Sequence, residues 1–143
     1  IYLVVENLTR LEVNSLMNVV DSYVSLHRAE GFGLPLAESM LLGKPTVATN
    51  WSGNLDFMNE ETACLVDYDL VVLKKDIPPF KKGFCWADPK ISDAAKCMKK
   101  LLEDRKFYDT ISDNAKKYVS ERLSQDAVGA IVASRLREIY SKH

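Results

Sequence analysis

The chain has 143 residues, of which 47% are hydrophobic and 27% charged, and its formal net charge at pH 7 is −1. These values are typical of one globular domain, and they exclude a nucleic-acid-binding domain that relies on a large basic surface. No apolar run approaches the length of a membrane span. The cysteines, Cys64, Cys85 and Cys97, lack metal-ligand spacing, so we expect reduced thiols in a cytoplasmic protein.

The first half of the chain alternates predicted strands and helices. Residues 1–5 (IYLVV) are β-branched and apolar, which predicts a buried strand. Thr9 and Glu12 form a capping box that begins a helix, and a second helix opens at Pro35 and ends before Gly43. Further strands are predicted at 22–26, 46–50 and 63–68. This alternation is typical of βαβ units, so we predict an α/β, Rossmann-like parallel sheet.

The second half has a different character. Residues 69–90 are charged and show no steady period, which predicts a long loop held in place by Tyr68, Phe80 and Trp86. Beyond this loop, apolar stripes predict three helices, with Ser92 and Ser124 as N-caps. The predicted organisation is a βαβ segment at 1–68, a long loop at 69–90 and a helical tail at 91–143.

One stretch, "RAEGFGLPLAE", points to a ligand. It lies between a strand and a helix, where doubly wound folds bind ligands and where a helix N-terminus favours phosphate. Gly31 and Gly33 would let the backbone approach such a ligand. The flanking carboxylates of Glu30 and Glu38 would repel phosphate, but they accept hydrogen bonds from hydroxyl pairs. A ligand with phosphates between two hydroxyl-bearing ends is a nucleotide sugar, with Glu38 at the ribose and Glu30 at the transferred sugar.

Simpler interpretations remain open for each residue. Glu38 alone would suit the helix dipole, and Glu30 alone would suit a solvated loop. His27 and Arg28 either assist a phosphate or have no such role, and Trp51 either stacks on the ligand or merely packs. As a whole, the chain is alternatively a non-catalytic nucleotide-binding module, or a glycosidase that uses Glu30 and Glu38 as its acid and nucleophile.

The motifs "EGFGLPLAE", "GKPTVAT" and "SGN" resemble the C-terminal, donor-binding half of GT-B retaining glycosyltransferases of family 4 type (glycosyl transferases group 1). The resemblance covers residues 1 to about 67 and resumes at "WADP" (86–89). Within that group, "SLHRAEGFGLPLAE", "SGNLDFM" and "LVDYDLV" are similar to a bacterial branch that builds polysaccharide and O-antigen chains. The resemblance therefore implies transfer of a hexosyl group from a nucleotide sugar to a glycan or lipid-linked acceptor, with retention of configuration.

The resemblance also implies roles for individual residues. Glu30 would be catalytic beside the donor sugar, and Glu38 would bind the ribose. The remaining donor-binding residues would be Gly31, Phe32, Gly33 and Leu34 in the loop, and Ser52 and Gly53 after the third strand. Phe32 is also a candidate for the core, and we favour that position slightly. No metal or other cofactor is expected.

The family usually carries an Arg and a Lys for the diphosphate, and an acceptor-binding domain, upstream of these motifs. Both would precede Ile1, so we expect this chain to be part of a longer enzyme and to transfer no sugar alone. We expect the whole enzyme to work in the cytoplasm, where nucleotide sugars are made, and to associate peripherally with a membrane.

Overall fold

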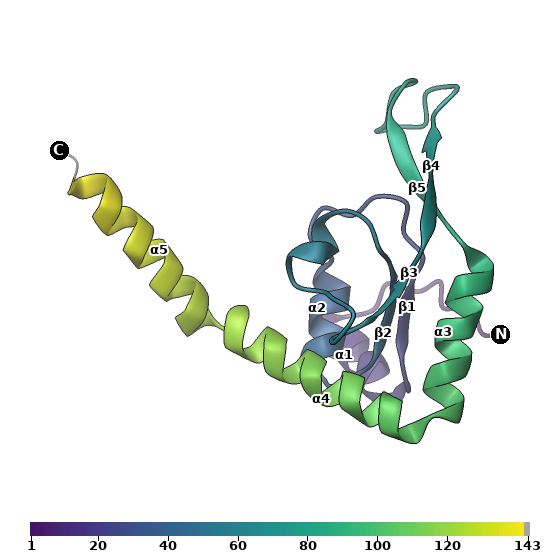
Figure 1. Ribbon diagram of the computed structural model, residues 1–143, viewed down its shortest axis with the longest axis horizontal. Coiled ribbons are helices and arrows are strands. Elements are labelled where there is room, and N and C mark those ends of the chain that lie inside the picture. The colour runs from purple at the N-terminus through teal and green to yellow at the C-terminus, as the bar shows by residue number, and fades with distance from the viewer. Residues whose placement is uncertain (142–143) are drawn as a thin grey trace.

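A computed structural model describes residues 1–141 and shows a parallel sheet between two helical layers (Figure 1). Its strands β1 (Tyr23–Ser25), β2 (Thr46–Thr49) and β3 (Cys64–Val66) lie in the order β1-β2-β3. All neighbours are parallel. Helices α2 (Leu34–Leu41) and α4 (Arg105–Arg122) pack on one face, and α3 (Ile91–Glu103) packs on the other. The predicted α/β fold is confirmed.

The central strand explains why the sheet has two cores. All four residues of β2 are buried, and successive side chains of a strand point to opposite faces. Ala48 packs in the cluster under α2 and α4, which includes Leu36, Met40, Phe57, Ala115 and Val119. Val47 packs in the cluster under α3, which includes Cys64, Val66, Ala94 and Leu101. Because neither face of β2 meets solvent, "TVAT" lacks the polar–apolar alternation of a half-exposed strand, and even its two threonines are buried.

The first two helices begin where their capping residues predict. In α1 (Arg10–Val19) the Thr9 hydroxyl accepts a hydrogen bond from the Glu12 amide, and the Glu12 carboxylate accepts one from the Thr9 amide at 2.7 Å. Helix α2 starts at Leu34, with Pro35 in its first turn and Gly33 as N-cap at a left-handed φ of +93°. A side chain there would be strained, and its Cβ would lie 3.0 Å from Leu36 Cδ1.

The three C-terminal helices are also confirmed, with one change of cap. Helix α3 is preceded by Lys90, so that Ser92 lies inside the helix and is not its N-cap. Asp104 caps α4, and Ser124 caps α5 (Gln125–Tyr140) as predicted. Helix α5 extends away from the sheet and buries none of its residues (Figure 1). No helix within residues 1–141 is long and apolar enough to cross a bilayer.

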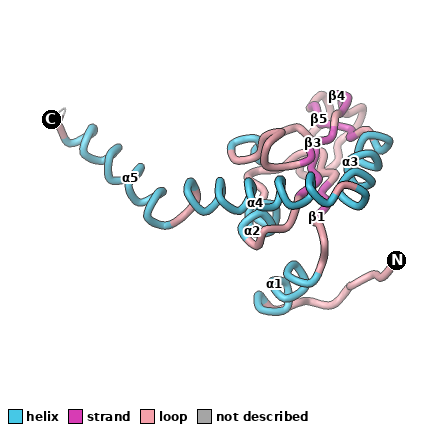
Figure 2. Tube along the Cα trace, turned by 60° about the horizontal axis from the view of Figure 1, so that its bottom comes forward, coloured by secondary structure: helices cyan, strands magenta, loops and turns pink. Residues whose placement is uncertain are grey.

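Two predicted segments are wrong. Residues 1–5 form no strand but are an exposed extended segment, which lies with α1 apart from the sheet (Figure 2). A strand needs a paired neighbour, and this segment has none in the described chain. Residues 69–90 are not a long loop: β4 (Tyr68–Val72) and β5 (Cys85–Pro89) pair antiparallel, with Leu70 opposite Ala87. This hairpin rises from the end of β3 and projects beyond the sheet (Figure 1).

Candidate functional site

The carboxyl ends of the three parallel strands carry the residues singled out from the sequence. The chain leaves β1 into the loop 26–33, which enters α2, and leaves β2 into the turn 50–56. It leaves β3 directly into the hairpin β4–β5. Ligands of doubly wound sheets bind outside this edge, so the arrangement of these three connections defines the candidate site.

The turn after β2 braces the loop after β1. The Ser52 hydroxyl donates a hydrogen bond to the Glu30 carbonyl at 2.7 Å and accepts one from the Glu30 amide at 3.2 Å. The Gly53 amide donates to the same carbonyl at 3.2 Å. Ser52 itself has a φ of +86° and a ψ of −157°, a conformation that is otherwise almost confined to glycine. Strained backbone of this kind concentrates at ligand sites, and here it holds the Glu30 loop in position.

Gly31 and Gly53 lie where the turn after β2 contacts the loop after β1, a contact that we call the Ser52–Gly53 brace, and the two glycines have opposite surroundings. A Cβ on Gly53 would lie 2.0 Å from the Gly31 carbonyl oxygen, so only glycine permits this approach of the two backbones. A Cβ on Gly31 would meet nothing within 4 Å. The backbone of the loop is therefore supported from behind by Gly53, while the space in front of Gly31 is open to a ligand.

The carboxylate of Glu30 folds back over its own loop. One of its oxygens, Oε1, accepts a hydrogen bond from the Gly31 amide at 3.0 Å. Burial, and secondarily the charge of Glu30, raise the pKa of Tyr23 at the start of β1. One Glu30 carboxylate oxygen is thus oriented by the backbone of its own loop, and the other accepts no hydrogen bond from residues 1–141.

Glu38 lies one turn into α2 and is paired from a distant part of the chain. The Arg10 guanidinium of α1 forms an ion pair with the Glu38 carboxylate, whose side chain is 22% exposed, whereas that of Arg10 is 71% exposed. An open pocket of about 350 Å³ adjoins Glu38; its walls are apolar and comprise Phe32, Leu34, Ala37, Leu41, Val119, Leu123 and Val128. The predicted residues therefore fall into two neighbouring groups, one around this pocket and one around the Ser52–Gly53 brace.

Phe32 bridges the loop and the core. Its ring packs on that of Phe57 at a centroid distance of 4.9 Å, yet the residue remains 37% exposed. Phe32 therefore contacts Phe57 of the core but is not itself a core residue, and it also lines the pocket beside Glu38.

Three residues whose roles the sequence left open prove to be structural contacts of the site. His27 Nε2 donates to the Trp51 carbonyl at 3.0 Å and to Asn54 Oδ1 at 3.1 Å; because both partners are acceptors, this nitrogen carries the proton. Arg28 donates to Asp88 at 2.6 Å and lies over the Trp86 ring. These contacts tie the loop after β1 to the turn after β2 and to the hairpin.

The aromatic residues predicted to hold the segment 69–90 in place do make such contacts. Trp51 packs against Tyr68 with ring centroids 5.2 Å apart, and Phe80 meets Trp86 edge-on at 6.2 Å. The pairing of Arg10 with Glu38 had no signal in the sequence, because the partners are 28 positions apart and belong to no common motif.

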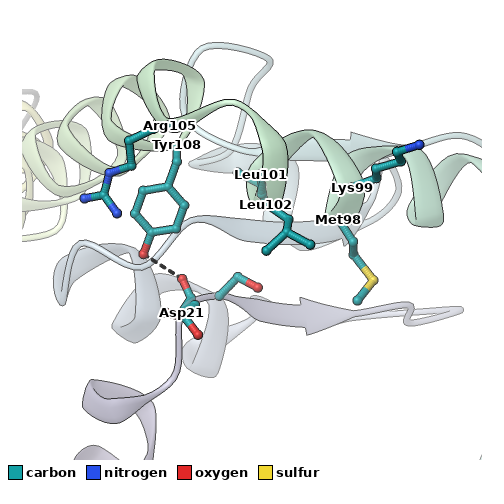
Figure 3. Close-up of a pocket in the computed structure, with 8 residues that line it drawn as sticks. Asp21, Met98, Lys99, Leu101, Leu102, Arg105 and Tyr108 are labelled. Carbon is teal, nitrogen blue, oxygen red and sulfur yellow. Dashed lines mark hydrogen bonds between the residues drawn. The ribbon is translucent and has the colours of Figure 1, made fainter.

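A larger cavity, of about 450 Å³, lies at the opposite end of β1 and does not belong to this site. It lies between Asp21 and Ser22 and the apolar side of α3, and the Tyr108 hydroxyl closes one end by donating to the Asp21 carbonyl at 2.8 Å (Figure 3). It lies at the amino end of β1, whereas doubly wound sheets bind their ligands outside the carboxyl ends of the strands.

The His, Cys, Asp and Glu side chains of residues 1–141 give little support to metal or thiol chemistry. No group of three or more His, Cys, Asp or Glu side chains in that range is arranged to hold a metal ion. The described cysteines are free thiols, and burial raises the pKa of the Cys64 thiol to about 12. Because a thiolate is the reactive form, Cys64 is inert at neutral pH.

Comparison with known proteins identifies the family to which the chain belongs. The family model described as "Glycosyl transferases group 1" matches residues 3–118. None of the curated proteins compared with the chain matches it. Among solved structures, Anabaena Alr3699/HepE in complex with UDP-glucose superposes with a TM-score of 0.66 at 22% identity, covering 90% of this chain and 30% of that one. Sucrose-phosphate synthase (tll1590) from Thermosynechococcus elongatus gives 0.65 at 19% identity, covering 90% and 27%.

The extent of these matches decides what they establish. At such identities the structures show a shared fold, and this chain spans less than a third of the length of either protein. The family model, in contrast, covers most of the chain. The protein belongs to the glycosyl transferases group 1 family, and its α/β, Rossmann-like fold is that of the GT-B glycosyltransferases it superposes on.

Proposed function

We propose that this chain is the donor-binding part of a retaining glycosyltransferase that takes a hexosyl group from a nucleotide sugar. The observation that carries the proposal is the braced loop at the strand ends, in which Ser52 and Gly53 hold the backbone of Glu30 and Gly31 at the entrance to α2. Complexes of Alr3699/HepE with UDP-glucose and with UDP are consistent with a donor of this class.

Each part of the loop has a chemical task in this proposal. Glu38 accepts hydrogen bonds from the ribose hydroxyls, and Glu30 accepts them from the transferred sugar. The backbone of residues 31–34 and the start of α2 face the diphosphate, where a helix N-terminus stabilises negative charge. Departure of the diphosphate is the step that builds this charge, so preorganised amides there lower the barrier to transfer.

The proposal extends to the setting of the enzyme. The acceptor is a glycan or a lipid-linked glycan of polysaccharide or O-antigen synthesis, bound by an upstream domain that also supplies basic residues for the diphosphate. Transfer requires no metal, takes place in the cytoplasm, and involves peripheral association with a membrane. The 143 residues cover less than a third of either solved structure that they superpose on, so we expect transfer only from a protein that carries the rest of the cleft.

The test compares the chain alone with an enzyme that joins it to an upstream Rossmann domain, using a panel of nucleotide sugars. We expect transfer only from the longer enzyme, with the anomeric configuration of the product, read by NMR, equal to that of the donor. Glu30→Ala should lower turnover far more than it lowers affinity for the free nucleoside diphosphate.

Four results would contradict the proposal in different places. Robust transfer by the chain alone would refute the claim that an upstream domain supplies the acceptor-binding half of the cleft. An inverted product would refute retention of configuration. Hydrolysis of a simple glycoside without any nucleotide would favour the glycosidase alternative. Nucleotide binding without transfer by any longer enzyme would favour a binding module.

A further inference from the structure

The tip of the β4–β5 hairpin, residues 73–84, concentrates positive charge. Within it lie one aspartate, Asp76, and four exposed lysines: Lys74, Lys75, Lys81 and Lys82. The tip therefore carries +3, and since the whole chain carries −1, the rest of the protein carries −4. None of these lysines forms an ion pair with any residue in the described range 1–141. The hairpin tip is a cationic surface on an otherwise anionic molecule.

The hairpin tip is an ordered turn that holds these lysines outward. The Leu73 amide donates to the Phe84 carbonyl at 2.8 Å, and the Gly83 amide donates back to the Leu73 carbonyl at 2.9 Å. The Asp76 carboxylate accepts from the Lys82 amide at 2.8 Å, so it serves the backbone of the turn. Leu73 is 5% exposed and anchors the turn. Because the backbone of the turn is already ordered, little backbone entropy is lost when its lysines bind a partner.

Apolar side chains accompany the charge. Phe84 is 58% exposed and Val72 is 55% exposed, at the two points where the strands enter the hairpin tip. The ribbon projects from the sheet with no helix packed on it (Figure 1). Lysines beside an exposed aromatic ring and an aliphatic residue match the boundary between lipid headgroups and acyl chains.

We propose that the hairpin tip docks on the surface of an anionic lipid bilayer. Charge complementarity selects this occupant, because basic clusters of this size are attracted to acidic headgroups. Distance argues against a role on the donor diphosphate. The Ala87 amide donates to the Arg28 carbonyl at 3.0 Å, so the loop after β1 lies level with Ala87 and its cross-strand partner Leu70. Lys74 lies four residues beyond Leu70, which at roughly 3.3 Å per residue is about 13 Å of extended chain. A partner outside the cleft therefore fits the tip better than a ligand inside it.

The same contacts that secure the hairpin would relay this anchoring to the site. Phe80 in the tip meets Trp86 of β5, and Trp86 lies 5.3 Å beneath the guanidinium of Arg28. Arg28 is two residues from Glu30 and is tied to the hairpin through Asp88. A docked tip thus fixes the strand-end site at a set height above the membrane. The inference deepens the membrane association proposed above and requires no assumption about sugar transfer.

The experiment is flotation of the protein with phosphatidylcholine vesicles, either pure or containing 30% phosphatidylglycerol. We expect binding to the anionic vesicles alone, and its loss at 0.5 M salt, since screening shortens the reach of surface charge. The variant K74Q/K75Q/K81Q/K82Q should partition about 1,000-fold less, given the attraction that each basic residue contributes near such a surface. Phe84→Ser should lower partitioning about tenfold through lost apolar insertion.

A matched control removes four exposed lysines from α3 and α4 in the variant K96Q/K99Q/K116Q/K117Q, which should change partitioning by less than about threefold at equal net charge. The double variants K74Q/K75Q and K81Q/K82Q should each fall between the wild type and the tip variant, so the proposal stays testable if the quadruple change harms folding. Equal loss in the tip and control variants would overturn the proposal. So would equal binding to pure phosphatidylcholine, or binding to dextran sulfate but not to vesicles. Because flotation needs no nucleotide, a protein that floats but transfers no sugar refutes only the proposed function.

Discussion

Replacing Gly53 with alanine tests whether the turn after β2 sets the position of the donor loop. The added Cβ would lie 2.0 Å from the Gly31 carbonyl oxygen and 3.2 Å from the Glu30 carbonyl oxygen. An ordinary contact begins at 3.4 Å, so the backbones must separate by about 1.4 Å. Overpacking against rigid backbone costs about 1–3 kcal/mol of folding stability, and a displacement of about 1 Å at a reacting centre can cost roughly 100-fold in rate.

Thermal unfolding by circular dichroism and turnover of the longer enzyme measure the two effects. We expect the Gly53→Ala variant to melt roughly 4–12 °C lower and to lose about 100-fold in turnover. Gly31→Ala is the matched control, because its Cβ meets no protein atom within 4 Å. It should keep the wild-type melting temperature yet bind the donor more weakly. Wild-type stability and turnover in the Gly53→Ala variant would refute the claim that this turn positions the loop.

Two further predictions concern charge and thiol reactivity. Arg10→Gln should raise nucleotide affinity by up to about fivefold in calorimetry, because the ion pair between Arg10 and Glu38 is worth about 0–1 kcal/mol and competes with the ligand. Weaker binding by the variant would mean that Arg10 assists the ligand instead. At pH 8 a maleimide should label exposed Cys85 rapidly and Cys64 only on unfolding, as read by peptide mass spectrometry. The folded protein holds the Cys64 proton more tightly than the unfolded chain does, so this thiol should lower the stability of the fold as the pH rises from 9 toward 12. Cys64→Ala should remove that alkaline decline in stability. Equal labelling of Cys85 and Cys64 in the folded protein would contradict the burial of Cys64.

The elements that the sequence predicts well are those whose signals are local. The capping box at Thr9, the cap at Ser124 and Pro35 in the first turn of α2 each act within one helical turn, and each is found where it was predicted. The position of Glu30 beside Ser52 follows from a topological rule, because parallel strands deliver their loops to the same edge.

The elements that the sequence misses depend on pairing between distant residues. Residues 1–5 have the propensity of a strand, but a strand forms only where an edge is available at the right register. The hairpin β4–β5 lacks an Asn-Gly or Asp-Gly turn, and four of the five residues of β4 are exposed, so the alternation that marks a half-buried strand is absent. Its strands are defined by cross-strand partners such as Leu70 and Ala87, 17 positions apart.

The central claim is that Glu38 binds the ribose of a nucleotide sugar, and a double-mutant cycle between protein and ligand tests it most directly. Calorimetry would compare the wild type and Glu38→Gln with the preferred nucleoside diphosphate and with its 2′-deoxy and 3′-deoxy forms. We expect Glu38→Gln to cost about 1–3 kcal/mol with the natural ribose, the scale of a charge-assisted hydrogen bond, and removal of the ribose hydroxyls to cost the wild type a similar amount. The variant should then be almost indifferent to the missing hydroxyls. Equal discrimination between ribose and deoxyribose by both proteins, or unchanged nucleotide affinity in Glu38→Gln, would contradict the assignment.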